Sequence, residues 1–406
     1  MMRRGLLSDL FTGVVAKKLT LVETITESSN QHEFQGAKPL RALFGDEDRK
    51  GIRARFVLLS QEQATISEDG FLSWSNVRKG KPRAAEYHLY YSGNSVTEAM
   101  LPDDTVFIAL HLDGSALVVV TPAASTTQSQ LLWLFGMSEQ HTFGFEYRDI
   151  AHDQPAELDY AVRYILDELG IEVEEPEANR LDALLEPYGG AFPGTRVFSK
   201  LARSSLTHVN ANDDADAVLM AWLEREELLF RRLERRIVAQ RLRTGFMAQG
   251  EADVEGFISF SLSVQNRRKS RAGQALEHHL EALFLARDLR FARGALTENK
   301  NRPDFLFPGA DEYGDPAFPE EKLSMLGAKS TLKDRWRQVL AEAGRIKNKH
   351  LITLEPGISE AQTQQIADAK LQLVLPAALH VTFRDSQRSG LMTLTDFLAH
   401  VGARQE

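Results

Sequence analysis

Cysteine is absent from all 406 residues of the chain. This absence excludes disulfides, thiolate zinc sites and thiol nucleophiles, so any metal must take oxygen or imidazole ligands. No apolar run approaches the ~20 residues that a membrane-spanning helix needs. An excess of basic residues is also lacking, because 57 acidic residues outnumber 48 basic ones and give a formal net charge of −9. Net charge therefore argues against indiscriminate nucleic-acid binding, and any DNA contact must come from local basic clusters.

The remaining composition is that of an ordinary globular protein, with 43% apolar and 26% charged residues. A chain of this length exceeds what one hydrophobic core supports, which predicts two domains. The N-terminus begins like a signal peptide with Arg3 and Arg4, but Ser8 and Asp9 interrupt the apolar region that such a peptide needs. Together with the absence of cysteine, this pattern leads us to expect a cytoplasmic protein.

The N-terminal part of the chain, from about residue 18 to 148, has the pattern of short strands. Asp113–Gly114 predicts a tight hairpin, and the close spacing of the strands predicts an antiparallel barrel or sandwich. A short helix is expected at Pro39–Phe44, and a helix at Ala156–Gly170 closes the unit. The expected strands are Lys18–Glu27, Arg53–Ser60, Glu86–Tyr91, Asp104–Leu112, Ala116–Thr121, Leu131–Phe135 and His141–Tyr147.

A change of composition separates this part from the rest. Ile171–Arg196 is rich in Glu, Pro and Gly, which predicts a linker rather than a packed element. We therefore expect a first domain at 1–170, a linker at 171–196 and a second domain at 197–406.

The C-terminal part alternates helices with strands, and this alternation predicts an α/β domain with a mixed central sheet covered on both faces. Its first element is a long charged helix at Ala217–Arg243, which has the pattern of a scaffold or dimer element. The other expected helices are Gly273–Arg287, Leu332–Lys349, Ser359–Ala369 and Leu394–Val401, and the expected strands are Asp304–Phe307, Leu323–Lys329, His350–Leu354 and Leu371–Leu375.

Three side chains of this part fit metal-dependent phosphodiester hydrolysis. Such a reaction needs a metal that orients and acidifies water, and a further positive group near the scissile phosphate. Asp304 and Glu342 can ligate Mg²⁺, which prefers oxygen ligands and keeps several waters. Lys329 ends a strand beside Asp304, where its charge can hold the phosphate. The pattern therefore predicts a magnesium site at these three residues.

The expected helix at Leu332–Lys349 places Glu342 on one stripe with Arg335. Lys333 and Arg335 match the acceptors of guanine, and Asp334 can accept a hydrogen bond from the amino group of cytosine, so we expect a target rich in G·C pairs. A structural alternative for Asp334 is the favourable interaction of an acid with the helix dipole.

Further candidates are weaker because each has an ordinary structural alternative. Glu277 is a possible additional carboxylate on an earlier helix. Tyr313, between Asp304 and Lys329, can touch the phosphate or be an ordinary loop tyrosine. A basic cluster just before the Glu277 helix is a phosphate-facing patch or a solvated loop. Its members are Arg267, Arg268, Lys269 and Arg271.

Three blocks in fixed order, 266–273, 302–308 and 329–338, closely resemble the catalytic domain of the EcoRII restriction endonuclease family. The resemblance covers roughly Phe192–Val401. That family has the PD-(D/E)XK nuclease fold, in a variant whose last acidic ligand follows the lysine on the next helix. The resemblance implies a Type II site-specific deoxyribonuclease that cuts double-stranded DNA with Mg²⁺, acts as a homodimer and has a cognate DNA methyltransferase as its genetic partner.

The same resemblance implies roles for the candidate residues. Asp304, Lys329 and Glu342 correspond to the magnesium and catalytic residues, Glu277 to a supporting acid and Tyr313 to an active-site tyrosine. Lys333, Asp334 and Arg335 lie at the positions where related enzymes of the family read G·C pairs.

The N-terminal domain resembles the effector domain of this family only loosely, through residues 30–36 and 39–45 and the order of its strands. The family's effector domain is a mostly β pseudobarrel that binds a second copy of the recognition site, which implies a two-site, Type IIE enzyme. The candidate DNA contacts here are Lys79, Lys81 and Arg83, although an exposed hairpin has the same composition.

Two other functions fit the sequence. One is a modification-dependent defence nuclease whose N-terminal domain reads altered bases, and cleavage of methylated against unmethylated DNA distinguishes it. The other is a non-cleaving DNA-binding protein with a dead nuclease domain. The presence of Asp304, Lys329 and Glu342 together disfavours this last interpretation.

Overall fold

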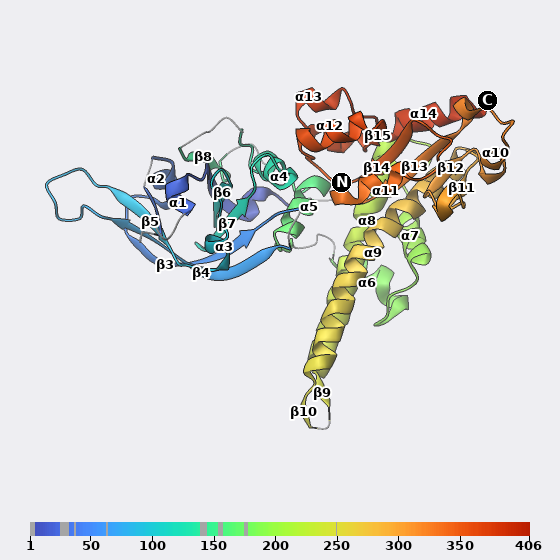
Figure 1. Cartoon of the computed structure of the whole chain (residues 1–406). Coiled ribbons are helices and arrows are strands. Elements are labelled where there is room, and N and C mark those ends of the chain that lie inside the picture. Colours follow the sequence, from blue (N-terminus) through green and yellow to red (C-terminus); the bar gives the residue numbers. More distant parts are fainter. Residues whose placement is uncertain are drawn as a thin grey trace. The chain divides into compact units, whose positions relative to one another are not determined.

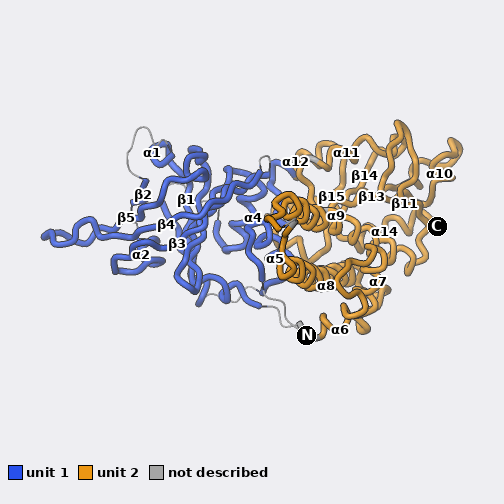
Figure 2. The backbone as a smooth tube through the Cα atoms, turned by 90° about the horizontal axis from the view of Figure 1, so that it is seen from below, with its two compact units in different colours: residues 1–173, 356–362 blue, residues 174–355, 363–406 orange. Residues whose placement is uncertain are grey.

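The computed structural model of the chain describes residues 5–24, 32–35, 38–61, 64–138, 144–152, 157–173, 178–248 and 250–406. Within them the chain divides into two compact units (Figure 2). Unit 1 consists of Met1–Val173 with Pro356–Gln362, and unit 2 consists of Glu174–Glu355 with Thr363–Glu406. None of the helices in the described ranges has the length and apolar character that crossing a membrane requires.

Unit 1 is built on one eight-stranded sheet with the order β2-β5-β4-β3-β7-β6-β1-β8 (Figure 1). Neighbouring strands are antiparallel, except for β3 and β7, which are parallel. Its strands are β1 Phe11–Lys18, β2 Glu33–Gln35, β3 Arg49–Leu58, β4 Ile66–Asn76, β5 Tyr87–Tyr91, β6 Thr105–His111, β7 Ala116–Thr121 and β8 Glu146–Asp149. Its helices are α1 Leu21–Thr24, α2 Lys38–Phe44, α3 Ser95–Glu98, α4 Thr126–Leu134 and α5 Tyr160–Glu168, with a short 3-10 turn at Leu7–Asp9.

Both faces of this sheet are buried at its central strand β7. Val118 and Val120 of β7 belong to one apolar cluster, and Val119 between them belongs to another. A strand buried on both faces reads as a continuous apolar run, which is why Ala116–Thr121 lacks the alternation of an exposed strand. The ring centroids of Phe34 in β2 and Phe145 beside β8 lie 5.7 Å apart, so the two edges of the sheet approach each other although its hydrogen-bonded order is open.

Two segments of unit 1 differ from the prediction. The first strand is β1 at Phe11–Lys18, and the expected strand at Lys18–Glu27 is replaced by α1 where the structure describes it. Leu131–Phe135, expected as a strand, lies in and just after α4, whose N-terminus is capped by Ser125 Oγ accepting from Gln128 N at 3.1 Å. A short apolar run does not distinguish a buried strand from a buried helix. Residues 30, 31, 36 and 141–143 of the predicted motifs lie outside the described residues.

Unit 2 contains a five-stranded sheet with the order β11-β12-β13-β14-β15. Strands β11, β12 and β13 pair antiparallel, whereas β13, β14 and β15 pair parallel, so the sheet is mixed as the sequence predicts. The strands are β11 Ala292–Arg293, β12 Phe305–Phe307, β13 Ser324–Lys329, β14 Lys349–Thr353 and β15 Leu371–Val374. The helices are α6 Ala178–Leu185, α7 Thr195–Ser204, α8 Ala215–Thr244, α9 Val254–Ala286, α10 Ala310–Gly314, α11 Trp336–Leu340, α12 Glu360–Asp368, which begins within the segment assigned to unit 1, α13 Asp385–Arg388 and α14 Leu394–Gln405.

Helices pack on both faces of the sheet in unit 2. On one face, the ring of Phe284 from α9 lies 5.0 Å from that of Phe305 and 5.3 Å from that of Phe307. On the other face, Gly327 of β13 lies under α11, where an added Cβ would be 3.0 Å from Val339 Cγ2. The glycine therefore lets α11 approach the strand closely.

The helices α8 and α9 form a long antiparallel hairpin, closed at its tip by β9 Met247–Ala248 and β10 Glu251–Ala252 (Figure 1). Ion pairs join the two helices along their length. Arg268 Nε donates to Glu234 Oε2 at 2.7 Å, and the buried Arg271 pairs with Glu227. The helix Ala217–Arg243 of the sequence prediction is thus present as α8, whereas α9 starts at Val254, well before the expected Gly273.

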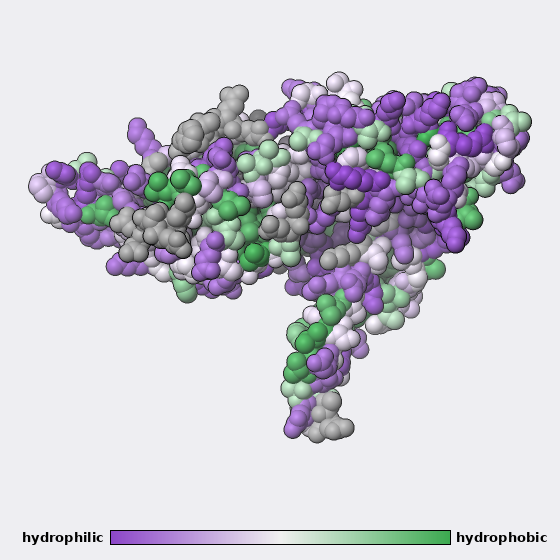
Figure 3. All heavy atoms as spheres, in the orientation of Figure 1, coloured by the Kyte–Doolittle hydropathy of each residue, from purple (hydrophilic) through white to green (hydrophobic). Residues whose placement is uncertain are grey.

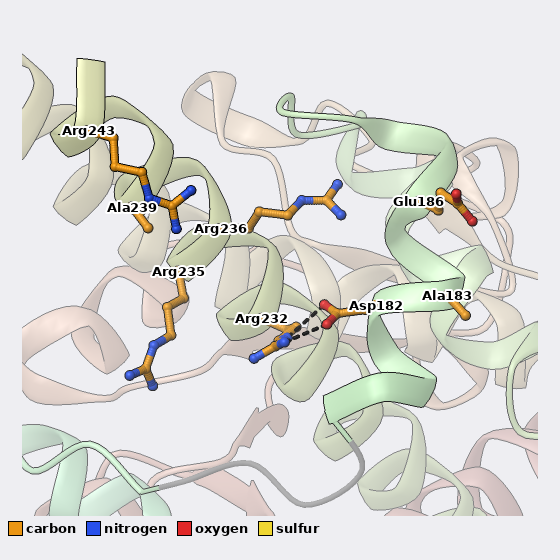
Figure 4. A pocket seen from close by; sticks show the side chains of 8 residues that line it. All are labelled: Asp182, Ala183, Glu186, Arg232, Arg235, Arg236, Ala239 and Arg243. Carbon is orange, nitrogen blue, oxygen red and sulfur yellow. Dashed lines mark hydrogen bonds and ion pairs between the residues drawn. The ribbon is translucent and has the colours of Figure 1, made fainter. Parts of the chain in front are cut away.

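The segment Ile171–Arg196, expected as a linker, contains the packed helix α6. Leu181 and Leu185 are buried, and Asp182 forms a bidentate ion pair with Arg232 of α8 (Figure 4). Arg236 of α8 donates to the carbonyl of Leu185 at 3.1 Å and so anchors the end of α6. The prediction was wrong because it weighed the Pro and Gly content above the leucine spacing of four, which marks a helix face.

The expected helix at Leu332–Lys349 is also broken. A 3-10 turn at Lys333–Arg335 precedes α11, which ends at Leu340, and residues 341–348 form turns. Ala343 has a φ of 48°, a left-handed conformation that no helix continues through. Glu342 is therefore on a turn and not on a helix.

Candidate active site

Asp304 and Lys329 lie side by side at the ends of two paired strands. Asp304 directly precedes β12, and Lys329 is the last residue of β13. Lys329 Nζ donates to Asp304 Oδ2 at 2.7 Å, and the backbone N–H of Ala328 donates to the same oxygen at 2.7 Å. Both side chains keep partial access to solvent, with 17% and 19% of their surface exposed. The two hydrogen bonds fix the carboxylate and leave Oδ1 as the oxygen that can bind a metal.

Glu342 faces this pair from the turn after α11. Its carboxyl is partly buried, and Oε2 has no hydrogen-bond partner within the described residues. Burial raises the pKa of Glu342 to about 7; the positive charge of Lys329 opposes the increase and the negative charge of Asp304 adds to it. The three side chains that the sequence singled out are thus close enough to interact electrostatically.

These residues fit a hard divalent cation. A buried carboxylate oxygen without a hydrogen-bond partner is costly unless a cation or proton is bound to it, and Glu342 Oε2 is such an atom. Among the described ranges no group of three or more His, Asp or Glu residues forms a metal cage. Asp304 and Glu342 would therefore supply the protein ligands, and water and phosphate oxygens would complete the coordination that Mg²⁺ favours.

The turn that carries Glu342 is held at both ends by the segment preceding Asp304. Asn301 Nδ2 donates to the carbonyl of Ala341 at 2.8 Å, and the N–H of Gly344 donates to Glu298 Oε2 at 3.1 Å. The two hydrogen bonds bracket Glu342, so the segment leading to one ligand is tied to the turn that carries the other.

Tyr313 supports the same turn from the side. Its hydroxyl donates to the carboxylate of Glu298, with distances of 2.7 and 2.6 Å to the two oxygens, and accepts from the N–H of Arg345 at 3.3 Å. Burial and the hydrogen bond to Glu298 raise the pKa of Tyr313 to about 12. The structure thus directs this hydroxyl at Glu298, and contact with a phosphate stays a prediction.

Glu277, expected as a supporting acid, is engaged by an arginine. Arg293 of β11 donates to Glu277 Oε2 at 2.6 Å and to Glu281 Oε2 at 2.8 Å. Within the described residues no direct contact joins Glu277 to Asp304 or Lys329. A role for Glu277 at the metal stays a prediction.

The predicted base-reading residues lie in the short turn between β13 and α11. Lys333 and Arg335 are exposed, and the side chain of Asp334 lies outside the described part of the chain. The N–H of Leu332 donates to the buried Glu355, which fixes the start of this turn. Two cations are therefore presented to solvent one turn away from Lys329.

The basic cluster at 267–271 lies inside α9 and not in a loop before it. Arg268 and Arg271 are paired with acids of α8, which corrects the expectation that both face a phosphate. Arg267 is exposed, with its guanidinium 4.4 Å from the ring centroid of Phe192, and the side chain of Lys269 is not described. A phosphate contact stays a prediction for Arg267 and Lys269.

The candidate DNA contacts of unit 1 are all exposed. Lys79, Lys81 and Arg83 lie in the long connection between β4 and β5. Lys79 Nζ pairs with Asp48 Oδ2 at 2.7 Å. An effector role for this connection stays a prediction.

Sequence patterns did not reveal the residues that support the site. Glu298 and Asn301 lie in a loop whose spacing follows no period, and their partners are backbone groups 46 and 40 positions away. Glu355 had a weak signal, because it is an acid two residues after a fully buried strand, where a charge needs a partner.

Comparison with known proteins gives a family match to the segment that contains this site. Residues 230–398 match the model of the family described as EcoRII C terminal. The Type II restriction enzyme EcoRII of Escherichia coli is 40% identical over 233 residues, which are 57% of this chain and 56% of that protein. The Type II restriction enzyme SsoII of Shigella sonnei is 28% identical over 148 residues, covering 34% of this chain and 47% of that protein. The chain thus spans about half the length of the curated relatives it matches.

Solved structures give a weaker likeness. A metal-depleted Ecl18kI in complex with uncleaved DNA matches 56% of this chain and 84% of that chain at 18% identity, with a TM-score of 0.42. A restriction endonuclease PspGI–substrate DNA complex matches 52% and 93% at 13% identity, with a TM-score of 0.43. Scores this low carry no conclusion about the fold. The segment 230–398, which matches the model of the EcoRII C-terminal family, contains Asp304, Lys329 and Glu342.

Proposed function

We propose that this chain is a Type II site-specific deoxyribonuclease that hydrolyses double-stranded DNA with Mg²⁺. The observation that carries the proposal is the convergence of Asp304, Lys329 and Glu342, with a 2.7 Å ion pair and a buried carboxylate oxygen that lacks a hydrogen-bond partner. The names of the two curated relatives, both Type II restriction enzymes, support the same reaction.

Each of the three side chains has a separate role in the proposed reaction. When bound, Mg²⁺ supplies charge neutralisation and an acidified water. Asp304 and Glu342 hold the cation, and the ammonium of Lys329 binds a non-bridging oxygen of the scissile phosphate. A water oxygen forms a new bond to phosphorus while one bond from phosphorus to a deoxyribose oxygen breaks, and the leaving oxygen takes up a proton. Lys329 thus stabilises the charge that grows on the phosphate.

Digestion of plasmid DNA tests the proposal. Lys329→Ala is expected to lower the cleavage rate by at least about a hundredfold, the usual loss when one electrostatic stabiliser is removed, with DNA binding retained. Lys322→Ala, an exposed lysine just before β13, is the matched control. A Lys329→Ala enzyme as fast as wild type, or a wild type that cuts equally well in excess EDTA, contradicts the proposal.

We also propose that Lys333, Asp334 and Arg335 read G·C pairs. Their turn starts from a backbone fixed by Glu355 and presents exposed cations, which match the guanine acceptors. Arg335→Ala is expected to relax base preference at one position of the site by about 1–3 kcal/mol of discrimination. Sequencing the ends cut from a randomised library measures this preference, and an unchanged profile contradicts the assignment.

Two further features of the activity are proposed. Two copies of the site, one for each strand, cut both strands in a single binding event, so the active form is a homodimer, with a cognate methyltransferase that protects the host's own DNA. Unit 1 binds a second DNA site through Lys79, Lys81 and Arg83, as a Type IIE enzyme requires. In the full chain, replacing these three by alanine is expected to remove stimulation by a second site in the same plasmid. Unchanged stimulation contradicts this role.

A further inference from the structure

The hairpin of α8 and α9 carries an exposed apolar stripe near its tip. Figure 3 shows hydrophobic side chains along this hairpin. Six large apolar side chains of the segment 242–262 are between 45% and 66% exposed. The stripe consists of Leu242, Met247, Val254, Phe257, Ile258 and Leu262.

The hairpin tip that carries the stripe has a capped helix and packed aromatic rings, so the exposure of these side chains does not result from a frayed helix end. Asp253 caps α9 by accepting from the N–H of Gly256 at 2.8 Å. Phe246 packs against Phe257 and Phe260, with ring centroids 5.3 and 5.7 Å apart. The tip is therefore a built structure with one apolar side left uncovered.

The sequence of α9 in this region is that of a covered helix. Among the thirteen residues 254–266, only Glu255 is charged, although charged residues make up 26% of the chain. Val254, Ile258 and Leu262 are spaced by four and lie on one face. The buried Arg271 of the same helix, which pairs with Glu227 of α8, lies at an angular position away from these three exposed side chains.

The extent of the stripe matches half of a dimer interface. Six side chains of this size, each about half exposed, present on the order of 500 Å² of apolar surface, which is at the upper end for an ordinary monomer. Two copies bury on the order of 1,000 Å², the lower bound for a specific protein–protein interface.

The stripe also has no apolar counterpart elsewhere in the described chain. The other nine exposed large apolar side chains are spread over eight separate segments of the described residues. The apolar surface that can cover the stripe is therefore the same stripe on a second copy of the hairpin. In such an isologous contact, the same patch of both copies takes part. The proposed function already requires a homodimer, and this inference rests on it: we propose that the two copies meet through the stripe, by packing two hairpins into a four-helix arrangement.

Charge inserted into the stripe tests the inference, independently of any cleavage activity. Ile258→Asp with Leu262→Asp is expected to reduce the molar mass by sedimentation equilibrium from twice the chain mass to 45.5 kDa. The matched control is Ser259→Asp with Ser263→Asp, which adds the same charges at the same spacing to exposed positions outside the stripe and keeps the dimer. Circular dichroism verifies that both variants keep their helix content.

Three outcomes overturn the inference: a monomeric wild type, a dimeric stripe variant or a monomeric serine control. The protein is measured at about 50 µM, a concentration well above the Kd of a specific interface. The absence of cysteine offers a second measurement. Ile258→Cys provides the single thiol of the chain, and a short bifunctional maleimide is expected to join two copies through it. Leu112→Cys, an exposed apolar position in unit 1, should give no such product.

An independent set of hydrogen bonds carries a second inference. Glu298 and Asn301 bind the backbone at Gly344 and Ala341, on either side of Glu342, and Tyr313 holds Glu298 through both of its oxygens. We infer that Glu298, Asn301 and Tyr313 are positioning residues that keep Glu342 beside Asp304. This inference rests on the proposed metal site.

The affinity for the metal alone tests it. Glu298→Gln with Asn301→Ala is expected to weaken binding of Mg²⁺ by about 10–100-fold, measured by the metal-induced rise in Tm as well as by half-saturation of cleavage, because groups that orient ligands have effects of that size. Glu321→Gln, an exposed glutamate, is the control. A change of less than about twofold in metal affinity overturns the inference, whereas a wild type that binds no Mg²⁺ overturns the metal site itself.

Tyr313→Phe separates positioning from direct action. The variant loses the hydroxyl that holds Glu298 and keeps the hydrogen bond from Gly344, so its metal affinity is expected to fall less than that of the double variant. If the hydroxyl acted on the substrate instead, cleavage at saturating Mg²⁺ would fall while the half-saturating concentration stayed the same. That result contradicts a positioning role for Tyr313.

Discussion

Glu342 destabilises the metal-free protein at neutral and alkaline pH, and Glu342→Gln is therefore expected to be more stable than wild type under these conditions. The folded protein holds the proton of Glu342 up to a pKa of about 7, because burial opposes the charged form. The unfolded chain releases it near the ordinary value of 4.5. Folding thus takes up a proton between these two pH values, so the stability of wild type falls as pH rises through that window.

The magnitude follows from the width of the window. A shift from 4.5 to about 7 corresponds to ~3 kcal/mol at full strength. Glu342 keeps partial contact with solvent, which screens the interaction, and we expect ~1–2 kcal/mol. The variant and wild type should have equal stability near pH 4.5, and the variant should gain this amount above pH 7.

Urea unfolding followed by tryptophan fluorescence, in EDTA and at several pH values, measures the difference. Glu251→Gln at the exposed tip of the hairpin is the matched control, and it should show no pH-dependent gain. Addition of Mg²⁺ should stabilise wild type and not Glu342→Gln, because only wild type keeps both carboxylate ligands. A gain that is the same at all pH values, or a wild type that is more stable at pH 8, refutes the reasoning.

Three further predictions concern packing in unit 2, and urea unfolding measures each of them. Gly327→Ala places a Cβ 3.0 Å from Val339 Cγ2 and is expected to cost ~1–3 kcal/mol by overpacking; an unchanged midpoint would show that α11 moves freely. Gly273→Ala, in the middle of α9 with open space around its Cα, is expected to add ~0.5–1 kcal/mol by helix propensity; a loss would contradict the open environment. Phe284→Ala removes a ring packed on Phe305 and Phe307 and is expected to cost ~3–5 kcal/mol; a cost below that of Gly327→Ala would contradict its central place.

The sequence predicted the strands that carry the site because their signals are local. β12 is a short apolar run that directly follows Asp304, and β13 is a short apolar run that ends at Lys329. The expected strands at 304–307 and 323–329 match them within a residue. Buried strands followed by a polar residue keep this pattern whatever surrounds them. Asp304 and Lys329 therefore lie at the strand ends that the sequence predicts.

The sequence did not predict how Glu342 reaches the site. A helical pattern runs on through Ala341 and Glu342, whereas α11 ends at Leu340 and Ala343 is left-handed. Long-range hydrogen bonds from Asn301 to Ala341 and from Gly344 to Glu298 hold this turn. The same limit applies to Leu131–Phe135, whose apolar run is compatible with strand and helix alike. Tertiary contacts decide such segments, and one sequence does not contain them.

The position of Gly327 explains why the second acid of the site, Glu342, comes from the turn after α11 and not from β13. Gly327 and Lys329 point to the same face of β13, so a carboxylate at 327 would be a neighbour of the lysine. Since a side chain there would strike Val339, that place is filled from above by α11 and the turn that follows it. The position of the Glu342 carboxylate consequently depends on the packing of α11 against β13. Loosening α11 is therefore expected to move Glu342 while leaving Asp304 and Lys329 in place.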